Sequence, residues 1–327
     1  MTLRLAGTPI SPPVLLAPLA GITDLPFRAL VSRFGAGLVV SEMIASGEFL
    51  AARPGTRAKA ELGLEAQNTS VQLAGREPAP MAEAARMVAD MGARIIDINM
   101  GCPAKKVVGG YSGSALMRNL DHALTLVDAV ATAVDVPVTL KTRLGWDHDA
   151  LNAPDLARRA QDAGVTMVVI HGRTRCQFYK GQADWAAIRA VKDAVSIPVV
   201  ANGDVINSPS ARTALDQSGA DGVMVGRGAQ GRPWVLAQIA ADLYGTPAPT
   251  VPTGAALIDM VQGHYQDMLA FYGADLGSRV ARKHLGWYMD DAGTPAPLRR
   301  EVLTCRDPQT VMQLIPLALG GSERAAA

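Results

Sequence analysis

The run Ile95–Pro103 carries a cysteine to the end of a predicted buried strand. Its first residues are β-branched and apolar, which suits a strand that is packed on both faces. Gly101 and Pro103 then interrupt the pattern on either side of Cys102, as in a sharp turn. A thiol presented there can take part in chemistry, but a half-buried cysteine is often only a small apolar group. The run alone leaves both interpretations open.

The other predicted strands also end in polar or glycine-rich segments. Each segment has an ordinary explanation by itself, such as a solvated lysine, a hydrogen-bonded histidine or a turn. Because the carboxyl ends of parallel strands meet at one end of a barrel, we expect these residues to lie together there. The strand ends are Pro18–Gly21, Ser41–Met43, Gln72, Asn99 with Cys102, Lys141 with Arg143, His171–Thr174, Asn202–Asp204 and Gly226–Gly228.

The last two strand ends favour a phosphate site. Gly203 and Gly226 allow a ligand to approach the backbone closely, and Arg227 supplies a guanidinium fork. A helix is predicted to begin at Pro233, and barrels commonly bind phosphate between their last two strands and a helix N-terminus.

Lys141 and His171 are predicted to face the middle of the barrel mouth, where a flat ring system can lie. Gln72 can hydrogen-bond such a ring. Together with the phosphate site, this pattern fits flavin mononucleotide (FMN) and, equally well on these grounds, a sugar phosphate. A lysine-based aldolase acting on a sugar phosphate therefore stays open at this point.

The elements that must position these residues alternate between strand and helix over residues 1–244. This alternation predicts an α/β fold, a (β/α)8 TIM barrel. A doubly wound open sheet is the alternative, but no GxGxxG follows the first strand. The predicted strands are Val14–Gly21, Leu38–Ile44, Thr69–Ala74, Ile95–Met100, Val136–Thr142, Met167–His171, Ile197–Asn202 and Gly222–Gly226. The predicted helices are Leu25–Phe34, Pro78–Met91, Asp121–Val134, Pro154–Ala163, Trp185–Val195, Ser208–Ser218 and Pro233–Tyr244.

The pattern changes after Tyr244. Residues 245–252 hold three prolines and a glycine, which predicts a stiff linker. Residues 253–327 contain only helix-like segments, and these predict a small C-terminal helical bundle domain. The segments are Thr253–Phe271, Gly277–Ala292, Leu298–Cys305 and Pro308–Leu319.

The composition is that of a globular protein with a large core, and the net charge of +1 gives no global sign of a nucleic-acid partner. The three cysteines form no CxxC pair and no metal-ligand spacing, so we expect no disulfide framework and no metal. There is no signal-peptide pattern at the N-terminus and no membrane-spanning apolar run, so we expect a cytoplasmic protein without a membrane partner.

With these motifs in place, the chain resembles the tRNA-dihydrouridine synthases, closest to the bacterial B subgroup that includes proteins historically called nitrogen-regulation proteins. Asn99–Pro103, combined with the matched lysine and histidine, is the most specific part of the resemblance. The matching stretches are Ala17–Arg28, Ser41–Met43, Val71–Leu73, Asp97–Val107, Gly113–Leu116, Lys141–Arg143, His171–Arg175, Asn202–Asp204 and Gly226–Gly228, with weaker matches at Arg279, Arg282–His284 and Trp287–Tyr288. The resemblance departs at Val108–Ser112, which is less basic and richer in glycine than in many family members.

The resemblance implies an enzyme in which NADPH reduces FMN and the reduced flavin then reduces the C5–C6 double bond of uridine in tRNA. It implies that Cys102 is the proton donor, and an ordinary thiol keeps its proton at neutral pH. It implies that FMN is held by Pro18, Leu19, Ala20, Gln72, Lys141, Asn202, Gly203, Asp204, Gly226 and Arg227, with His171 beside it. Asn99 would contact the flavin or the uracil.

A near-neutral chain must bind tRNA through local basic patches. Arg279, Arg282 and Lys283 follow helical spacing on one face, although a solvated amphipathic helix explains them equally simply. Arg173 and Arg175 form a second patch near the mouth, and Arg143 is a further candidate for contact with the substrate. We expect the enzyme to act as a monomer.

Two other classes of function stay open from the residues. Another FMN barrel, of the dihydropyrimidine or dihydroorotate type, would act on free small molecules and has no need of the helical domain. A non-catalytic tRNA-binding or regulatory protein would have no use for the thiol of Cys102.

Overall fold

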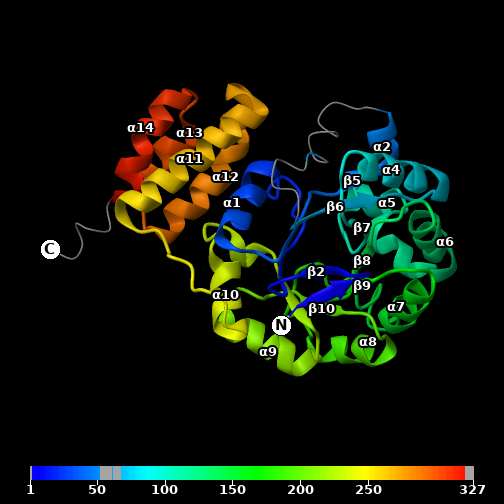
Figure 1. Ribbon diagram of the computed structural model, residues 1–327. Helices are drawn as coiled ribbons and strands as arrows, with labels where there is room; N and C mark the ends of the chain where they lie inside the picture. The colour runs from blue at the N-terminus through cyan, green and yellow to red at the C-terminus, as the bar shows by residue number, and fades with distance from the viewer. Residues whose placement is uncertain (1, 52–60, 62–67, 321–327) are drawn as a thin grey trace.

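A parallel barrel and a bundle of helices beside it make up the computed structural model, which describes residues 2–51, 61 and 68–320 (Figure 1). The sheet runs in the order β4-β3-β11-β10-β9-β8-β7-β6-β5 and closes through pairing of β4 with β6. This closure confirms the predicted barrel and excludes the doubly wound sheet. The strands are β3 (Val14–Leu16), β4 (Leu38–Val40), β5 (Ile44–Ala45), β6 (Thr69–Ala74), β7 (Ile96–Met100), β8 (Val138–Arg143), β9 (Met167–His171), β10 (Val199–Asn202) and β11 (Gly222–Val225).

The first two predicted strands differ most from the observed ones. The first ends at Leu16, because the following segment folds into a turn in which the Leu19 amide donates to Thr23 Oγ1. The second is divided into β4 and β5, which share one strand position. The predicted irregular crossover that follows, residues 45–68, lies largely outside the described residues.

Helices surround the barrel, and their ends follow the expected capping chemistry. Asp24 Oδ1 accepts from the Phe27 amide at the start of α1, and Asn207 forms a capping box with Ser210 at the start of α9. The helices of this part are α1 (Leu25–Phe34), α2 (Ser46–Leu50), α4 (Pro78–Asp90), α5 (Lys105–Gly109), η2 (Gly113–Arg118), α6 (Leu120–Ala131), α7 (Ala153–Asp162), η3 (Ala186–Ile188), α8 (Arg189–Ala194), α9 (Ser208–Ser218), η4 (Arg227–Ala229) and α10 (Val235–Tyr244). The short helices α5 and η2 were not expected from the sequence.

Successive side chains of each strand point alternately to an outer and an inner apolar layer, as a barrel requires. Outward side chains such as Ile96 and Ile98 pack against the helices. Inward side chains near the strand starts, such as Leu15 and Met167, form a separate cluster. This inner cluster also includes residues of an N-terminal hairpin, β1 (Leu3–Leu5) and β2 (Thr8–Ile10), so the hairpin closes the N-terminal end of the barrel.

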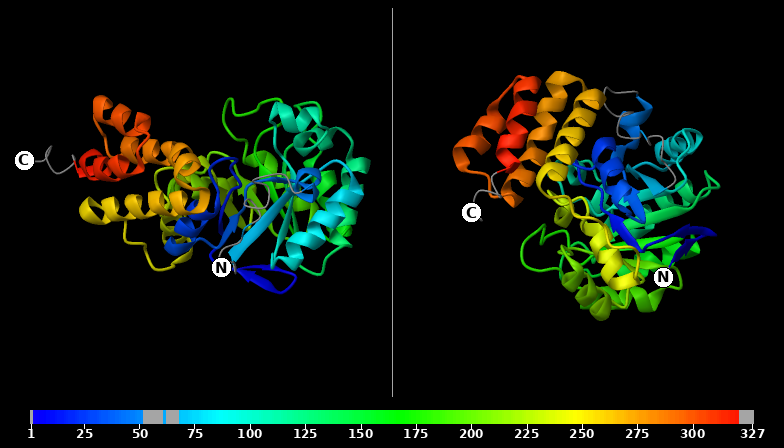
Figure 2. Two further views of the ribbon diagram at one scale, coloured as in Figure 1. Left: turned by 90° about the horizontal axis from the view of Figure 1, so that it is seen from above. Right: turned by 60° about the vertical axis from the view of Figure 1, so that its left-hand side comes forward.

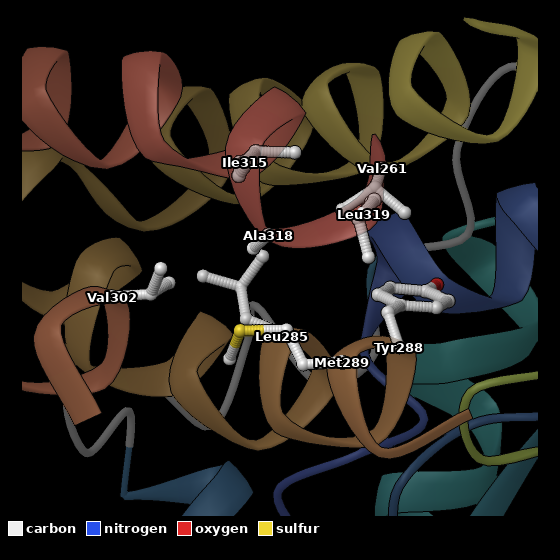
Figure 3. Close-up of a pocket in the computed structure, with 8 residues that line it drawn as sticks. All are labelled: Val261, Leu285, Tyr288, Met289, Val302, Ile315, Ala318 and Leu319. Atoms are coloured by element: carbon white, nitrogen blue, oxygen red, sulfur yellow. The ribbon is translucent and has the colours of Figure 1, made fainter. Parts of the chain in front are cut away.

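The C-terminal helices form a bundle with its own apolar core (Figure 2). They are α11 (Gly254–Tyr272), α12 (Ala274–Asp291), α13 (Ala296–Thr304) and α14 (Pro308–Leu319), and we call them the helical domain. The preceding residues 245–253 form neither helix nor strand, and residues 321–327 of the predicted domain lie outside the described chain. A small cavity inside this domain is lined almost entirely by apolar side chains around Leu285 and Tyr288, so we interpret it as a packing defect (Figure 3).

The helical domain docks on α1 of the barrel. The Phe27 ring lies 4.8 Å from the His284 ring and 5.8 Å from the His264 ring. Tyr272 donates from its hydroxyl to Asp24 Oδ2 at 3.1 Å. We call this contact the domain junction. Among the described helices, not one combines the length and the apolar character needed to cross a membrane.

Candidate active site at the barrel mouth

Parallel pairing sets the predicted polar residues side by side at the carboxyl ends of the strands. Gln72 of β6 is opposite Asp97 of β7, and Asp97 is opposite Thr139 of β8. Two residues further along, Asn99 is opposite Lys141. Because side chains alternate along a strand, all five residues point to the same interior face. The apolar interior near the hairpin thus becomes polar towards the mouth.

A buried chain of hydrogen bonds fixes Asn99. Thr139 Oγ1 and Gln72 Nε2 each donate to the Asp97 carboxylate at 2.6 Å, and Asn99 Nδ2 donates to Gln72 Oε1 at 2.7 Å. Burial raises the pKa of Asp97, while the donors from Gln72 and Thr139 oppose that rise. This network orients the Asn99 amide so that its oxygen faces the following turn.

That turn presents Cys102. Asn99 Oδ1 accepts from the amides of Gly101 at 3.2 Å and Cys102 at 3.0 Å. Ser114 Oγ donates to the Cys102 carbonyl at 2.9 Å, and Arg143 Nε donates to the Gly101 carbonyl at 2.7 Å. The backbone around the cysteine is therefore held from several sides, while the thiol is free and partly exposed.

Lys141 is a buried cation beside this cysteine. Its ammonium donates to Asn202 Oδ1 at 2.9 Å, and Asn202 in turn donates to the Met224 carbonyl. Burial lowers the pKa of Lys141 to about 8, Asp97 and Cys102 oppose the shift, and Arg143 adds to it. The lysine is thus mostly charged at neutral pH and has donor capacity left for a ligand.

Positive charge surrounds His171. Burial lowers its pKa well below the usual range, and the cations Arg143, Lys141, Arg173 and Arg227 lower it further. The imidazole is therefore neutral, and the mouth carries an excess of positive charge. Arg143 and Arg227 also lie over the ring of the exposed Tyr179, at 5.5 and 5.4 Å from its centre.

Two arginines predicted to contact the substrate are buried and already engaged. Arg143 donates to the carbonyls of Gly101, Thr174 and Phe178. Arg173 donates to those of Lys180 and Gly181 and pairs with Asp204 at 2.5 Å. Both guanidinium groups hold the loops of the mouth in place, so their effect on a substrate would pass mainly through those loops.

Asp204 joins the last two predicted strand ends. Partial burial disfavours its ionisation, but hydrogen bonds from Arg173 and the Ala183 amide, together with the charge of Arg227, lower its pKa overall. Its carboxylate also pairs with Arg227 at 3.2 Å. Gly203, immediately before it, has φ +110°, and a Cβ there would lie 2.9 Å from the His171 ring. Glycine therefore allows this loop to approach the histidine.

The loop after β3, residues 17–24, borders the same opening. Its residues Pro18 and Leu19 are half-buried and Ala20 is exposed. The Gly21 amide donates to the buried carboxylate of Glu42, which fixes the loop to the neighbouring strand position. Gly226, after β11, lies near Leu19, where a Cβ would have ordinary contacts.

The remaining predicted substrate residues lie near the mouth or on the helical domain. Arg175 is half-buried near the mouth, and Lys283 of the helical domain is exposed with its ammonium beside Gly21. Arg279 is exposed and pairs with Asp275 of its own helix at 3.0 Å. Arg282 is half-buried, so it is less accessible than Arg279 and Lys283 of the same helix.

Sequence reasoning did not assign a role to several residues that hold the site residues in place. Asp97 and Thr139 are polar positions inside otherwise apolar strands, and this interruption was the available signal. Glu42 lies within the predicted strand end Ser41–Met43 but was given no role there, and Tyr179 gave no comparable signal. Within the described ranges no group of His, Cys, Asp and Glu side chains has the arrangement of a metal site, and the prediction of no metal stays a prediction.

Comparisons with known proteins extend these observations. Residues 15–319 match a family model described as dihydrouridine synthase. The chain is 66% identical over 328 residues to a "probable tRNA-dihydrouridine synthase" of Rhodobacter capsulatus, covering 100% of both chains. It is 48% identical over 306 residues to "tRNA-dihydrouridine synthase B" of Xanthomonas campestris, covering 93% of this chain and 92% of that one.

Among solved structures, histamine dehydrogenase from Rhizobium sp. 4-9 is similar, with a TM-score of 0.55 and 12% identity. The match covers 81% of this chain but only 50% of that larger protein, so it supports the fold alone.

Proposed function

This chain belongs to the dihydrouridine synthase family, and on that premise we propose that it reduces uridines of tRNA with bound FMN, NADPH as electron donor and Cys102 as proton donor. Family membership makes it a tRNA-dihydrouridine synthase, a flavin-dependent oxidoreductase. We propose three further details: that the flavin is FMN, that the reductant is NADPH and that the acid is Cys102.

The chemistry of the mouth fits a flavin nucleotide. A phosphate, and a ring that gains negative charge on reduction, need cations and hydrogen-bond donors. The mouth offers Lys141 with free donor capacity and Arg227 with an exposed side chain. The neutral His171 is compatible with a ring packed beside it. We propose that FMN is held by Pro18, Leu19, Ala20, Gln72, Lys141, His171, Asn202, Gly203, Asp204, Gly226 and Arg227.

When bound, FMN supplies the hydride that adds to one carbon of the uracil C5–C6 double bond. The chain must deliver a proton to the other carbon, and Cys102 carries a free, partly exposed thiol at the same opening. Asn99 fixes the backbone of that cysteine, so the thiol needs little reorganisation before it reacts. The Lys141 ammonium would stabilise negative charge that develops on the bound flavin ring.

The uracil must leave its stack in the RNA to enter the mouth. We propose that Asn99, Arg143 and Arg173 shape the pocket that receives it, the two arginines by holding the loops. We assign phosphate contacts to Arg175 and, on the helical domain, to Arg279, Arg282 and Lys283. We also propose that the protein is cytoplasmic and acts as a monomer.

The observation that carries the proposal is the pairing of Asn99 with Lys141, which brings the thiol-bearing turn and a buried cation to one opening. The test is dihydrouridine formation, measured by mass spectrometry, in tRNA from a strain that lacks the activity. We expect Cys102→Ala to lower the rate by about 10²- to 10⁴-fold, the usual worth of a positioned acid.

Cys305→Ala, in the helical domain, is the matched control and should retain the wild-type rate. The flavin absorbance of Cys102→Ala should equal that of the wild type. An unchanged rate in Cys102→Ala would refute the acid role, and a wild-type protein that binds no FMN would refute the cofactor assignment.

A further inference from the structure

An arginine pair packs on one tryptophan at the rim of the mouth. The guanidinium carbons of Arg118 and Arg175 lie 4.9 and 4.7 Å from the ring centre of Trp146. The three residues follow three consecutive strands, β7, β8 and β9, and we call them the Trp146 cluster. Arg118 and Trp146 are absent from the flavin and substrate residues assigned above.

The loops that carry this cluster are tied together. The amides of Arg175 and Cys176 donate to the carbonyls of Gly145 and Trp146, each at 2.9 Å. Asn152 Nδ2 donates to the Met117 carbonyl at 2.8 Å, which joins the Trp146 loop to the end of η2. The positions of both arginines are therefore set before any ligand binds, which reduces the entropy lost on binding.

Within the described ranges, no carboxylate neutralises the charge of the pair. In the described part of the chain, neither Arg118 nor Arg175 forms an ion pair with a carboxylate, and Arg175 Nε is buried without a hydrogen-bond partner. Asp121, the acid nearest to Arg118 in sequence, pairs with Arg159 at 2.6 Å, and Asp147, next to Trp146, accepts from the Asp149 amide in its own turn. Arg279 and Arg173, by contrast, are paired with aspartates.

The cluster lies across the mouth from the helical domain. In the closed barrel, β8 is four positions away from β3, and β3 leads into α1, on which the helical domain docks. Figures 1 and 2 show α1 beside the helical domain and α6 and α7 on the far side of the barrel. A polyanion that touches both the helical domain and the Trp146 cluster must pass over the mouth.

We propose that the Trp146 cluster binds two backbone phosphates of the tRNA, one at each arginine, and forms a second anchor opposite the helical domain. This inference rests on the proposed function, because it takes the RNA substrate from it. A guanidinium packed on an aromatic face keeps its N–H fork available for phosphate oxygens, so stacking and phosphate binding are compatible. Two anchors on opposite sides orient the RNA over the thiol.

The test is the affinity for tRNA of the full-length, flavin-loaded protein, measured by fluorescence anisotropy at several salt concentrations. We expect Arg118→Gln with Arg175→Gln to weaken binding about tenfold or more near physiological salt. The slope of log affinity against log salt should fall by about 1.5, because two phosphate contacts are lost. Arg118→Gln alone changes an exposed side chain, so it should fold normally and show about half of the change in slope.

Arg86→Gln, on the exposed outer side of α4, is the matched control and should leave affinity and slope unchanged. The inference is overturned if the double variant binds tRNA with the wild-type slope, or if Arg86→Gln weakens binding equally. It is also overturned if the variants lose flavin, since the cluster would then be structural. If the wild-type protein forms no dihydrouridine in tRNA, the proposed function is wrong, whatever the variants do.

Discussion

The barrel mouth and the domain junction both bury ionisable side chains, but they differ in charge. At the mouth, Lys141 stays mostly cationic next to arginines and a neutral His171. At the junction, burial followed by the charge of Lys283 lowers the pKa of His284 to about 3, and burial keeps His264 neutral as well. A shifted pKa is therefore no sufficient sign of a functional site. The mouth is distinguished by charge that converges on an opening.

The junction uses its polar groups for packing. His264 and His284 lie with their ring centres 4.8 Å apart against Phe27, and His264 Nδ1 is hydrogen-bonded to Tyr288 at 3.0 Å. Asp24 differs from the two histidines because it ionises near neutral pH. Burial raises its pKa to about 6, and the Tyr272 hydroxyl donates to its carboxylate.

The largest effect should come from removing the aromatic centre of the junction. Phe27 of α1 is fully buried between the barrel core and the two histidines. We expect Phe27→Ala to lower the free energy of unfolding by about 3–5 kcal/mol, as for other buried phenylalanines. Urea unfolding followed by circular dichroism measures it. Phe178→Ala at the mouth, where the ring is 38% exposed, should cost below about 1 kcal/mol. Equal losses in the two variants would erase the distinction between the regions.

A second substitution at the junction should stabilise the protein instead of destabilising it. In the folded state Asp24 has a pKa of about 6 against an ordinary 3.8, so its contribution to stability is full below about pH 4 and is lost as pH rises through 6. Asparagine mimics the protonated carboxyl, so Asp24→Asn should raise the free energy of unfolding at pH 7.5 by at most about 3 kcal/mol.

This gain should shrink towards pH 4 in urea unfolding curves. Asp307, which caps α14 on the surface, provides the matched control: its hydrogen bonds to Thr310 lower its pKa, so Asp307→Asn should give no gain. A gain for Asp24→Asn that is independent of pH would show that ionisation of this carboxyl is not the cause.

The smallest effect concerns the charge of the mouth. With a pKa of about 8, Lys141 loses its proton as pH rises, and the charged fraction falls from about nine in ten at pH 7 to about one in ten at pH 9. We expect the affinity of the flavin-free protein for FMN to fall by up to about tenfold over this range, as measured by flavin fluorescence. Lys141→Gln should bind FMN more weakly and lack this pH dependence. The same slope in both proteins would assign the titration to another group.

The sequence predicted the barrel and the convergence at its mouth because both depend on periodicity. Alternation along each strand and parallel pairing suffice to bring Asn99, Lys141 and His171 to one end. The sequence did not predict the partners of each charge. Arg143 and Arg173 looked like residues for an anionic substrate, yet they satisfy backbone carbonyls of their own loops. Which carbonyls a loop leaves unpaired depends on its folded path, and sequence patterns do not contain that path.

The N-terminal hairpin escaped prediction for a related reason. Its strands, Leu3–Leu5 and Thr8–Ile10, have three residues each, too few to show a period. Leu5 and Ile10 are nevertheless buried against inward-facing residues of the barrel.

That hairpin has a kinetic consequence for the proposed reaction. In the described part of the chain, the hairpin covers the N-terminal end of the barrel, so under the proposed function the reductant and the RNA should both approach from the rim where Cys102 and Lys141 lie. We therefore expect the reductant and the RNA to compete for this opening under the proposed function. An excess of either one should then slow the reaction.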